Sequence, residues 1–99
     1  MVTVVWETWL ESGSEPEGLL LTQKIWSDMT SFNGYVSHNL LVDNDDKRHL
    51  LVVSKWLGRE HADQAVTDYA GSETVKLLKP LLARPRNRWV FTEDEAYSV

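Results

Sequence analysis

The segment from His49 to Leu57 constrains the fold most, because it is apolar on both faces when read as a β-strand. With side chains alternating between faces, one face carries Leu50, Val52, Ser54 and Trp56, and the other carries His49, Leu51, Val53, Lys55 and Leu57. An antiparallel strand with one wet face normally alternates between apolar and polar residues. Exposing a Val or Leu that could be buried forgoes roughly 1.5–3 kcal/mol. The pattern therefore predicts a sheet that is covered on both faces.

Three further segments have strand patterns. They are Val2 to Leu10, Tyr35 to Asp43 and Arg86 to Glu93, and the first of them is also apolar on both faces. Residues 44–47 are rich in Asn and Asp, whose side chains bond their own backbone in turns. This turn predicts that the second and third strands form a hairpin.

Apolar residues at helical spacing predict a first helix between the first two strands. Leu21, Ile25, Met29 and Phe32 recur along one helix face. Ser14 and Glu17 have the spacing of a capping box, in which each side chain satisfies a free backbone N–H of the other. Asn33-Gly34 supplies residues that tolerate positive φ, so we expect the helix to end there.

A second helical region follows Gly58 and has two parts. Its first part carries Ala62, Ala65, Val66 and Tyr69 on one face. Ser72 can cap a second part, which Pro80 is expected to kink or end. The order strand, helix, strand, strand, helix, strand is the split βαβ pattern. We therefore predict a ferredoxin-like α+β fold with an antiparallel sheet whose open face is covered by a second copy of the chain.

Composition restricts the class of protein. The 99 residues predict one domain, 1–99, ending in a polar tail over residues 93–99. A net charge of −5 argues against nucleic acid as a partner. The chain has no cysteine, no signal-peptide pattern and no apolar run long enough to cross a membrane. We therefore expect a cytoplasmic protein with no membrane partner.

The sequence also resembles a known family over about residues 2–93. The residues that carry the resemblance are Val4-Val5-Trp6, Gly13, Gly34-Tyr35, Asp43 to Asp46, Leu51 to Trp56, and Ser72. In these it resembles the antibiotic-biosynthesis-monooxygenase family of dimeric α+β barrels. The resemblance implies a homodimer and cofactor-free oxygenation of phenolic or quinol-like substrates by O₂. The family also includes haem-degrading members and many members without a known activity.

The same resemblance implies that haem degradation does not apply. The haem-degrading members use an Asn on the first strand, and a Trp and a His in the second helix. In this chain Trp6 takes the position of the Asn, Tyr69 lies nearest to that of the Trp, and no His occurs between Glu73 and Leu82. No cofactor is therefore expected. The spacing of the three histidines does not suggest a metal site either.

His38 and Tyr69 are the predicted catalytic residues. Cofactor-free oxygenation needs a base that removes a phenolic proton, and a His suits proton transfer near neutral pH. The alternative for His38 is a partly buried residue bonded to the backbone or to a partner subunit. Tyr69 offers an aromatic ring and a phenolic donor, or else packs in the core with its hydroxyl at the surface.

Four residues are predicted to bind the substrate: Trp6, Asn39, Trp56 and Arg86. Trp6 and Trp56 could stack on a ring or fill the core. Asn39 is expected on the strand face opposite His38, together with Tyr35, where it could bond a substrate carbonyl or pair across the dimer. Arg86 belongs to a basic cluster with Arg84 and Arg88. An Arg could hold an enolate or carboxylate, or pair with acidic neighbours at a solvated edge.

Two functions follow as hypotheses. One is a cofactor-free monooxygenase that oxidises a small aromatic, phenolic or quinol-type molecule with O₂. The other is a non-catalytic dimeric barrel that binds a small apolar ligand or a partner protein, because one fold hosts many functions.

Overall fold

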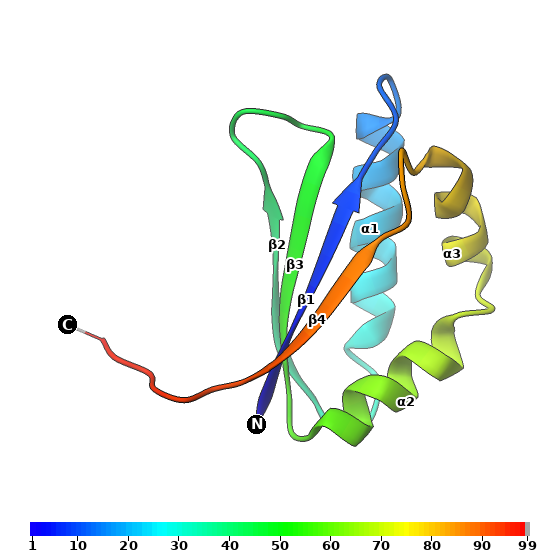
Figure 1. Cartoon of the computed structure of the whole chain (residues 1–99). Coiled ribbons are helices and arrows are strands. Elements are labelled where there is room, and N and C mark those ends of the chain that lie inside the picture. Colours follow the sequence, from blue (N-terminus) through cyan, green and yellow to red (C-terminus); the bar gives the residue numbers. More distant parts are fainter. Residues whose placement is uncertain (99) are drawn as a thin grey trace.

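The computed structural model describes residues 1–98, and its elements have the predicted order. Four strands form one antiparallel sheet in the order β2-β3-β1-β4: β1 (Val2–Trp9), β2 (Tyr35–Val42), β3 (His49–Trp56) and β4 (Asn87–Thr92). The helices are α1 (Glu15–Met29), α2 (Arg59–Tyr69) and α3 (Glu73–Leu78), followed by a 3₁₀ turn, η1 (Lys79–Leu81). All the helices lie on one side of the sheet (Figure 1). The predicted ferredoxin-like α+β fold is confirmed.

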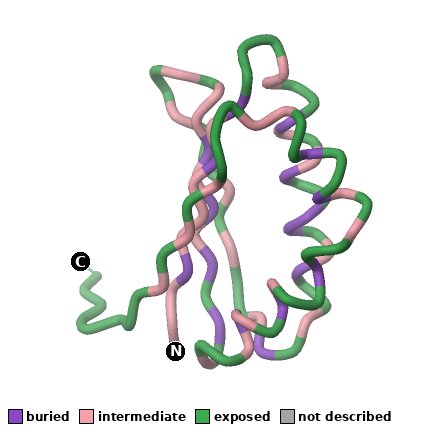
Figure 2. The backbone as a smooth tube through the Cα atoms, turned by 45° about the vertical axis from the view of Figure 1, so that its right-hand side comes forward, coloured by how far each residue is buried: buried purple, intermediate pink, exposed green. Residues whose placement is uncertain are grey.

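Strand register decides which side chains face the helices. β1 pairs with β3 so that Val4 lies opposite Ser54 and Trp6 lies opposite Val52. These positions belong to the helix-covered face, where the core residues Val4, Leu50, Val52 and Trp56 are almost fully buried. Burial is accordingly concentrated between the sheet and the helical layer (Figure 2). Of the two apolar faces predicted for the sheet, one therefore forms the core of the chain, against the helices.

The other face of the sheet is open and carries large apolar side chains. Leu41, Trp89 and Phe91 are 47%, 44% and 51% exposed. Val5 and Val53 are paired with each other on the two central strands of the same face, Val5 is also paired with Trp89, and both valines are half-buried. We call these five residues the open apolar face. Contiguous apolar surface of this kind is uncommon on monomeric proteins.

A β-bulge in β2 changes one predicted orientation. The pairing of β2 with β3 shifts register between Tyr35 and Ser37, so two residues oppose one at that point. Tyr35 therefore lies on the helix-covered face beside His38, and its hydroxyl bonds the imidazole. The expectation that Tyr35 shares a face with Asn39 was wrong, because strict alternation does not allow for an inserted residue.

The start of α1 also differs from the prediction. The Ser14 side chain makes no capping hydrogen bond, and the backbone N–H of Gly13 donates to the Glu15 carboxylate instead. The capping box with Glu17 is therefore not formed. Gly18 lets α1 approach the end of β1, since a Cβ there would lie 2.5 Å from the Cδ2 of buried Leu10.

The second helical region follows the prediction more closely. The backbone N–H of Val75 donates to Ser72 Oγ at 3.2 Å, so Ser72 caps α3 as expected. Regular α-helix ends at Leu78, just before the turn that contains Pro80. Residues 93–98 of the predicted tail are exposed and irregular, and its residue 99 lies outside the described residues. No helix within residues 1–98 is long and apolar enough to span a membrane.

Candidate active site

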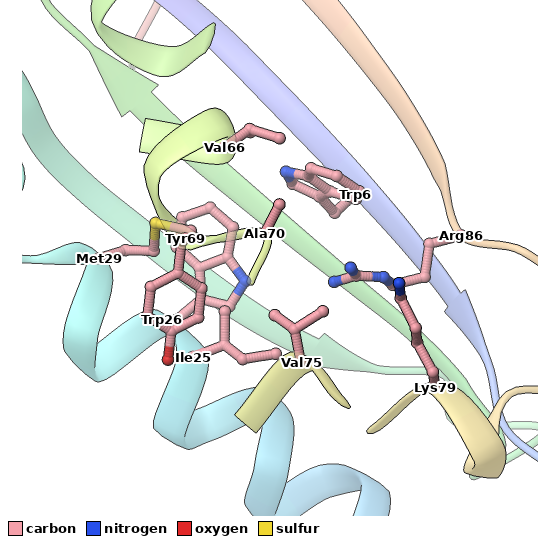
Figure 3. Close-up of a pocket in the computed structure, with 10 residues that line it drawn as sticks. All are labelled: Trp6, Ile25, Trp26, Met29, Val66, Tyr69, Ala70, Val75, Lys79 and Arg86. Carbon is pink, nitrogen blue, oxygen red and sulfur yellow. The ribbon is translucent and has the colours of Figure 1, made fainter. Parts of the chain in front are cut away.

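A cavity of about 190 Å³ lies between the helical layer and the half of the sheet formed by β1 and β4. Its lining residues come from every helix, from η1, from the middle of β1 and from the segment just before β4: Trp6, Ile25, Trp26, Met29, Val66, Tyr69, Ala70, Val75, Lys79 and Arg86. The rings of Trp6, Trp26 and Tyr69 form much of the wall (Figure 3). An engineered apolar cavity of about 150 Å³ binds benzene, so a space of this size suits a small flat ring system.

Trp6 forms the sheet side of the cavity. The alternation of β1 places it on the helix-covered face with Val4, where it lies opposite Val52 on β3 and Arg88 on β4. Trp6 is half-buried, so part of its ring is available to a ligand. The sequence left the face of Trp6 undecided, and strand register settles it.

Arg86 is the principal polar group of the cavity. Its guanidinium lies over the Trp6 ring, with the Cζ atom 4.8 Å from the ring centroid, which is cation–π geometry. Figure 3 shows the guanidinium pointing inward from the chain just before β4. Burial lowers the pKa of Arg86 below its ordinary value. No carboxylate within residues 1–98 forms an ion pair with it.

The other two arginines of the basic cluster are engaged elsewhere. Arg88 Nη2 donates to Asp63 Oδ1 at 2.7 Å and so links β4 to α2. Arg84 lies over Trp9 at 4.8 Å from the ring centroid. The expected pairing with an acidic neighbour therefore holds for Arg88. Arg86 is a desolvated cation whose donors are directed at the cavity, and such a group attracts an anion.

Tyr69 contributes its ring to the cavity wall, but its hydroxyl points away. The hydroxyl donates to Asp28 Oδ2 on α1 at 2.5 Å. Burial, followed by this bond to a carboxylate, raises the pKa of Tyr69 above its ordinary value. Tyr69 is therefore a neutral phenol at neutral pH, and it also packs edge-on against Phe32.

His38 lies on the helix-covered face but outside the cavity. Its Nδ1 atom shares a 2.6 Å hydrogen bond with the Tyr35 hydroxyl, and burial lowers the pKa of the imidazole. Trp26 packs against His38, with ring centroids 5.4 Å apart, and also lines the cavity. The indole of Trp26 thus lies between the predicted base and the space where a ligand would bind.

Trp56 and Asn39 are also outside the cavity. Trp56 is 2% exposed, and its indole N–H donates to Ser54 Oγ at 3.0 Å, so it packs in the core. Asn39 is exposed on the open side of the sheet, opposite Val53. Of the six predicted site residues, the structure brings Trp6, Tyr69 and Arg86 together.

Trp26 and Lys79 are among the lining residues that the sequence interpretation did not assign to the site. Trp26 occurs in the series Thr22, Ile25, Trp26 and Met29, which has helical i, i+3, i+4, i+7 spacing and whose members are all buried. This alternative reading of α1 would have found it. Lys79 has no such signal, because its position depends on how η1 packs over β1. No cluster of metal-ligating side chains occurs among residues 1–98.

Comparisons with known proteins find similarity in structure only. No protein-family model matches the sequence, and no curated protein sequence matches it. A putative antibiotic biosynthesis monooxygenase from Deinococcus radiodurans superposes with a TM-score of 0.86 at 14% identity, over 100% of this chain and 98% of that one. A putative antibiotic biosynthesis monooxygenase from Nitrosomonas europaea superposes with a TM-score of 0.85 at 12% identity. That match covers 96% of this chain and 100% of the other.

A third similar structure is SnoaB, a cofactor-independent oxygenase from Streptomyces nogalater. Its TM-score is 0.84 at 18% identity, and the match covers 96% of this chain and 94% of SnoaB. At these identities the likeness establishes the fold. The fold that the resemblance implied is thus confirmed, over nearly the whole length of both chains.

Proposed function

We propose that this chain, which has the fold of the antibiotic biosynthesis monooxygenase structures, is a cofactor-free monooxygenase that oxidises a small phenolic or quinol-type molecule with O₂. The observation that carries the proposal is Arg86, a half-buried cation with no described carboxylate partner, facing an aromatic-walled cavity. A flat phenol would lie among the rings of Trp6, Trp26 and Tyr69, with its oxygen at the guanidinium.

The first step is formation of the substrate anion. A guanidinium that donates to the phenolic oxygen favours the charged form of the phenol and lowers its pKa. The low polarity of the surrounding walls strengthens this interaction. Because the pKa of the bound phenol is lowered by Arg86, the substrate can ionise without a strong general base. Its proton leaves to solvent at the cavity mouth.

The second step is reaction of the anion with O₂. A phenolate with a free para C–H is electron-rich, and all the electrons for the reduction of O₂ come from the substrate. One oxygen atom bonds to the para carbon as that carbon loses its proton. The O–O bond then breaks, and the second oxygen leaves as water with the phenolic and ring protons, so that phenol and O₂ become quinone and water. An apolar cavity protects the intermediates from water.

His38 and Tyr69 stay predictions as catalytic residues. What supports Tyr69 is its ring in the cavity wall, while its hydroxyl is bonded to Asp28. A role for His38 as the base requires Trp26 to move, because that side chain lies against the imidazole. Asn39 and Trp56 would serve at most indirectly, one from the open sheet face and the other from the core.

We also propose that a second copy of the chain covers the open apolar face. Its support is the exposure of Leu41 on one edge strand and of Trp89 and Phe91 on the other, with Val5 and Val53 on the two central strands between them. Two such faces packed together form the homodimeric barrel that the resemblance implies. The expected cytoplasmic location stays a prediction.

An oxygen electrode tests the proposed activity. Pure protein, incubated with a panel of phenols, anthrones and quinols, is expected to consume O₂ in proportion to enzyme concentration. A matched pair of variants, Arg86→Met and Arg59→Met, separates the cavity cation from an exposed arginine that lines neither the cavity nor its mouth, and only the first should lose activity. Absence of enzyme-dependent uptake across the panel would refute the proposal.

The second candidate function, binding without turnover, is favoured by one observation. The two predicted catalytic residues already make hydrogen bonds within the chain, His38 through Nδ1 to the Tyr35 hydroxyl and Tyr69 through its hydroxyl to Asp28. In the same experiment this function predicts quenching of tryptophan fluorescence by the aromatic probes with no uptake of O₂.

A further inference from the structure

The mouth of the cavity continues into a groove of about 570 Å³. Trp6, Lys79 and Arg86 line both spaces, and the groove extends along the segment that leads into β4, with the full lining Trp6, Lys79, Leu82, Ala83, Arg84, Pro85 and Arg86. A ligand that fills the cavity therefore has room for a substituent that extends outward past Arg86.

The groove is lined by cations and by no acidic side chain. Lys79, Arg84 and Arg86 contribute its charges, and neither the cavity nor the groove has an Asp or Glu in its lining. Within residues 1–98, none of these three cations forms an ion pair. This concentration of positive charge occurs in a chain whose net charge is −5.

Two of the cations are held in place by aromatic rings. The guanidiniums of Arg86 and Arg84 each lie 4.8 Å from an indole, those of Trp6 and Trp9 respectively. Arg84 also faces Glu7 at a longer range, because its charge contributes to lowering the pKa of that carboxyl. Lys79 is exposed at the mouth and rises from η1 beside Arg86 (Figure 3). Unlike Arg84 and Arg86, it makes no cation–π contact among the described residues, so its ammonium can turn toward a second charged group of the ligand once Arg86 has bound the phenolic oxygen.

We propose that the substrate is an aromatic acid: a phenol whose ring fills the cavity and whose carboxylate-bearing substituent lies in the groove, bound by Lys79. The proposal rests on the proposed function for the role of the phenolic oxygen. It goes beyond that function because it assigns a second charged group of the substrate and the residue that recognises it. A hydrogen bond between ionised groups is stronger than a neutral one, so the acid binds more tightly than an uncharged analogue of equal shape.

A matched pair of probes tests this recognition. 6-Hydroxy-2-naphthoate carries the carboxylate, and 6-hydroxy-2-naphthamide replaces it by a neutral group of nearly the same size. Dissociation constants are measured by tryptophan fluorescence under anaerobic conditions, so that turnover plays no part. We expect the acid to bind at least about tenfold more tightly, which corresponds to about 1.4 kcal/mol.

Two variants with the same loss of charge locate the effect. In Lys79→Gln the preference for the acid should fall to about twofold or less. In the control Lys76→Gln, which removes an exposed lysine of α3 outside the groove, the preference should be unchanged. Equal affinities for the two probes in the unmodified protein, no binding of the acid at millimolar concentration, or a preference that survives Lys79→Gln would overturn the proposal.

The outcome is independent of the proposed activity. A preference for the acid that depends on Lys79, without O₂ uptake, would support the acidic subsite and refute the monooxygenase. Uptake of O₂ with simple phenols, together with equal binding of the acid and the amide, would refute the subsite and leave the monooxygenase standing.

Discussion

Replacement of Arg86 by Met separates function from stability in this protein. Met nearly preserves the length and apolar body of the side chain but removes the guanidinium. In the folded protein this cation is desolvated, as the lowered pKa of Arg86 indicates, and no described carboxylate compensates it. Removing a buried charge without a partner relieves a desolvation cost, which is large for isolated ions. Against this stands the lost cation–π contact with Trp6, worth about 0.5–2 kcal/mol.

These opposing effects give a definite expectation. Arg86→Met should leave the free energy of unfolding within about 1 kcal/mol of the original value, or increase it. The affinity for a phenolate should fall, because hydrogen bonds to charged groups contribute roughly 1.5–3 kcal/mol. That loss corresponds to a dissociation constant about 10- to 150-fold larger. Stability retained with binding lost is the usual signature of a residue kept for function.

Urea denaturation and a fluorescence titration measure the two quantities on the same samples. Arg88→Met serves as the control, because Arg88 is the neighbouring arginine that does have a carboxylate partner, Asp63. Its loss should reduce stability by about 1 kcal/mol or less, as is typical for a half-exposed pair. If Arg86→Met unfolded at much lower urea concentration with its ligand affinity intact, Arg86 would be a structural residue and the reasoning would fail.

Three other substitutions test separate parts of the structure. Gly34→Ala should destabilise the protein by at least about 1–2 kcal/mol in urea, because Gly34 has a φ of +85° and a Cβ there would lie 2.3 Å from the His61 ring; stability equal to that of the parent would contradict this. His49→Gln should lose most stability below the ordinary histidine pKa of about 6.5, down to the range where the carboxyls protonate, and progressively less as pH rises above it, as measured by thermal melting across pH. His49 bonds both Glu7 and Asp43, which raises the pKa of the imidazole, so its stabilisation is complete below its unfolded pKa and disappears as pH rises through the folded value. The pKa values of the Glu7 and Asp43 carboxyls are lowered, so the stability that these carboxyls contribute is present above their unfolded-state pKa values and is lost as pH falls through their folded-state pKa values. A stability difference between His49→Gln and the parent that does not change with pH would refute this assignment. Val53→Asp should convert a dimer into a folded monomer by light scattering, since Val53 lies centrally on the open apolar face, whereas a monomeric parent protein would refute the dimer.

The sheet was predictable because its signals are local. Short runs rich in Val, Leu and Trp located β1 and β3, and the two-faced pattern of β3 predicted a second apolar face on the sheet. The bulge beside Tyr35 was not predictable, because an inserted residue leaves no mark in an alternating pattern. The unused capping box at Ser14 shows the same limit, since a nearby Glu15 satisfied the backbone of Gly13 instead.

The site was only partly predictable, because it is assembled from distant segments. Trp6 and Arg86 are separated by most of the chain, and they meet because β4 pairs with the outer edge of β1. His38 has the chemistry of a base, but it lies on β2 at the opposite edge of the sheet. Residue type thus identified candidates, and sheet order decided which of them share a cavity. Lys79 is an example of a site residue that could not be predicted, since nothing in the sequence around it indicates a groove.

The most direct test of the proposed oxygenation uses labelled oxygen with protein treated with a chelator to remove metal ions. 1-Naphthol is incubated with the protein under ¹⁸O₂, and the product is analysed by mass spectrometry alongside O₂ consumption. The account predicts 1,4-naphthoquinone with one ¹⁸O atom, one O₂ consumed per product, and a rate that falls in Arg86→Met. Formation of quinone only after a metal ion or cofactor is added, or at the same rate in Arg86→Met, would contradict it.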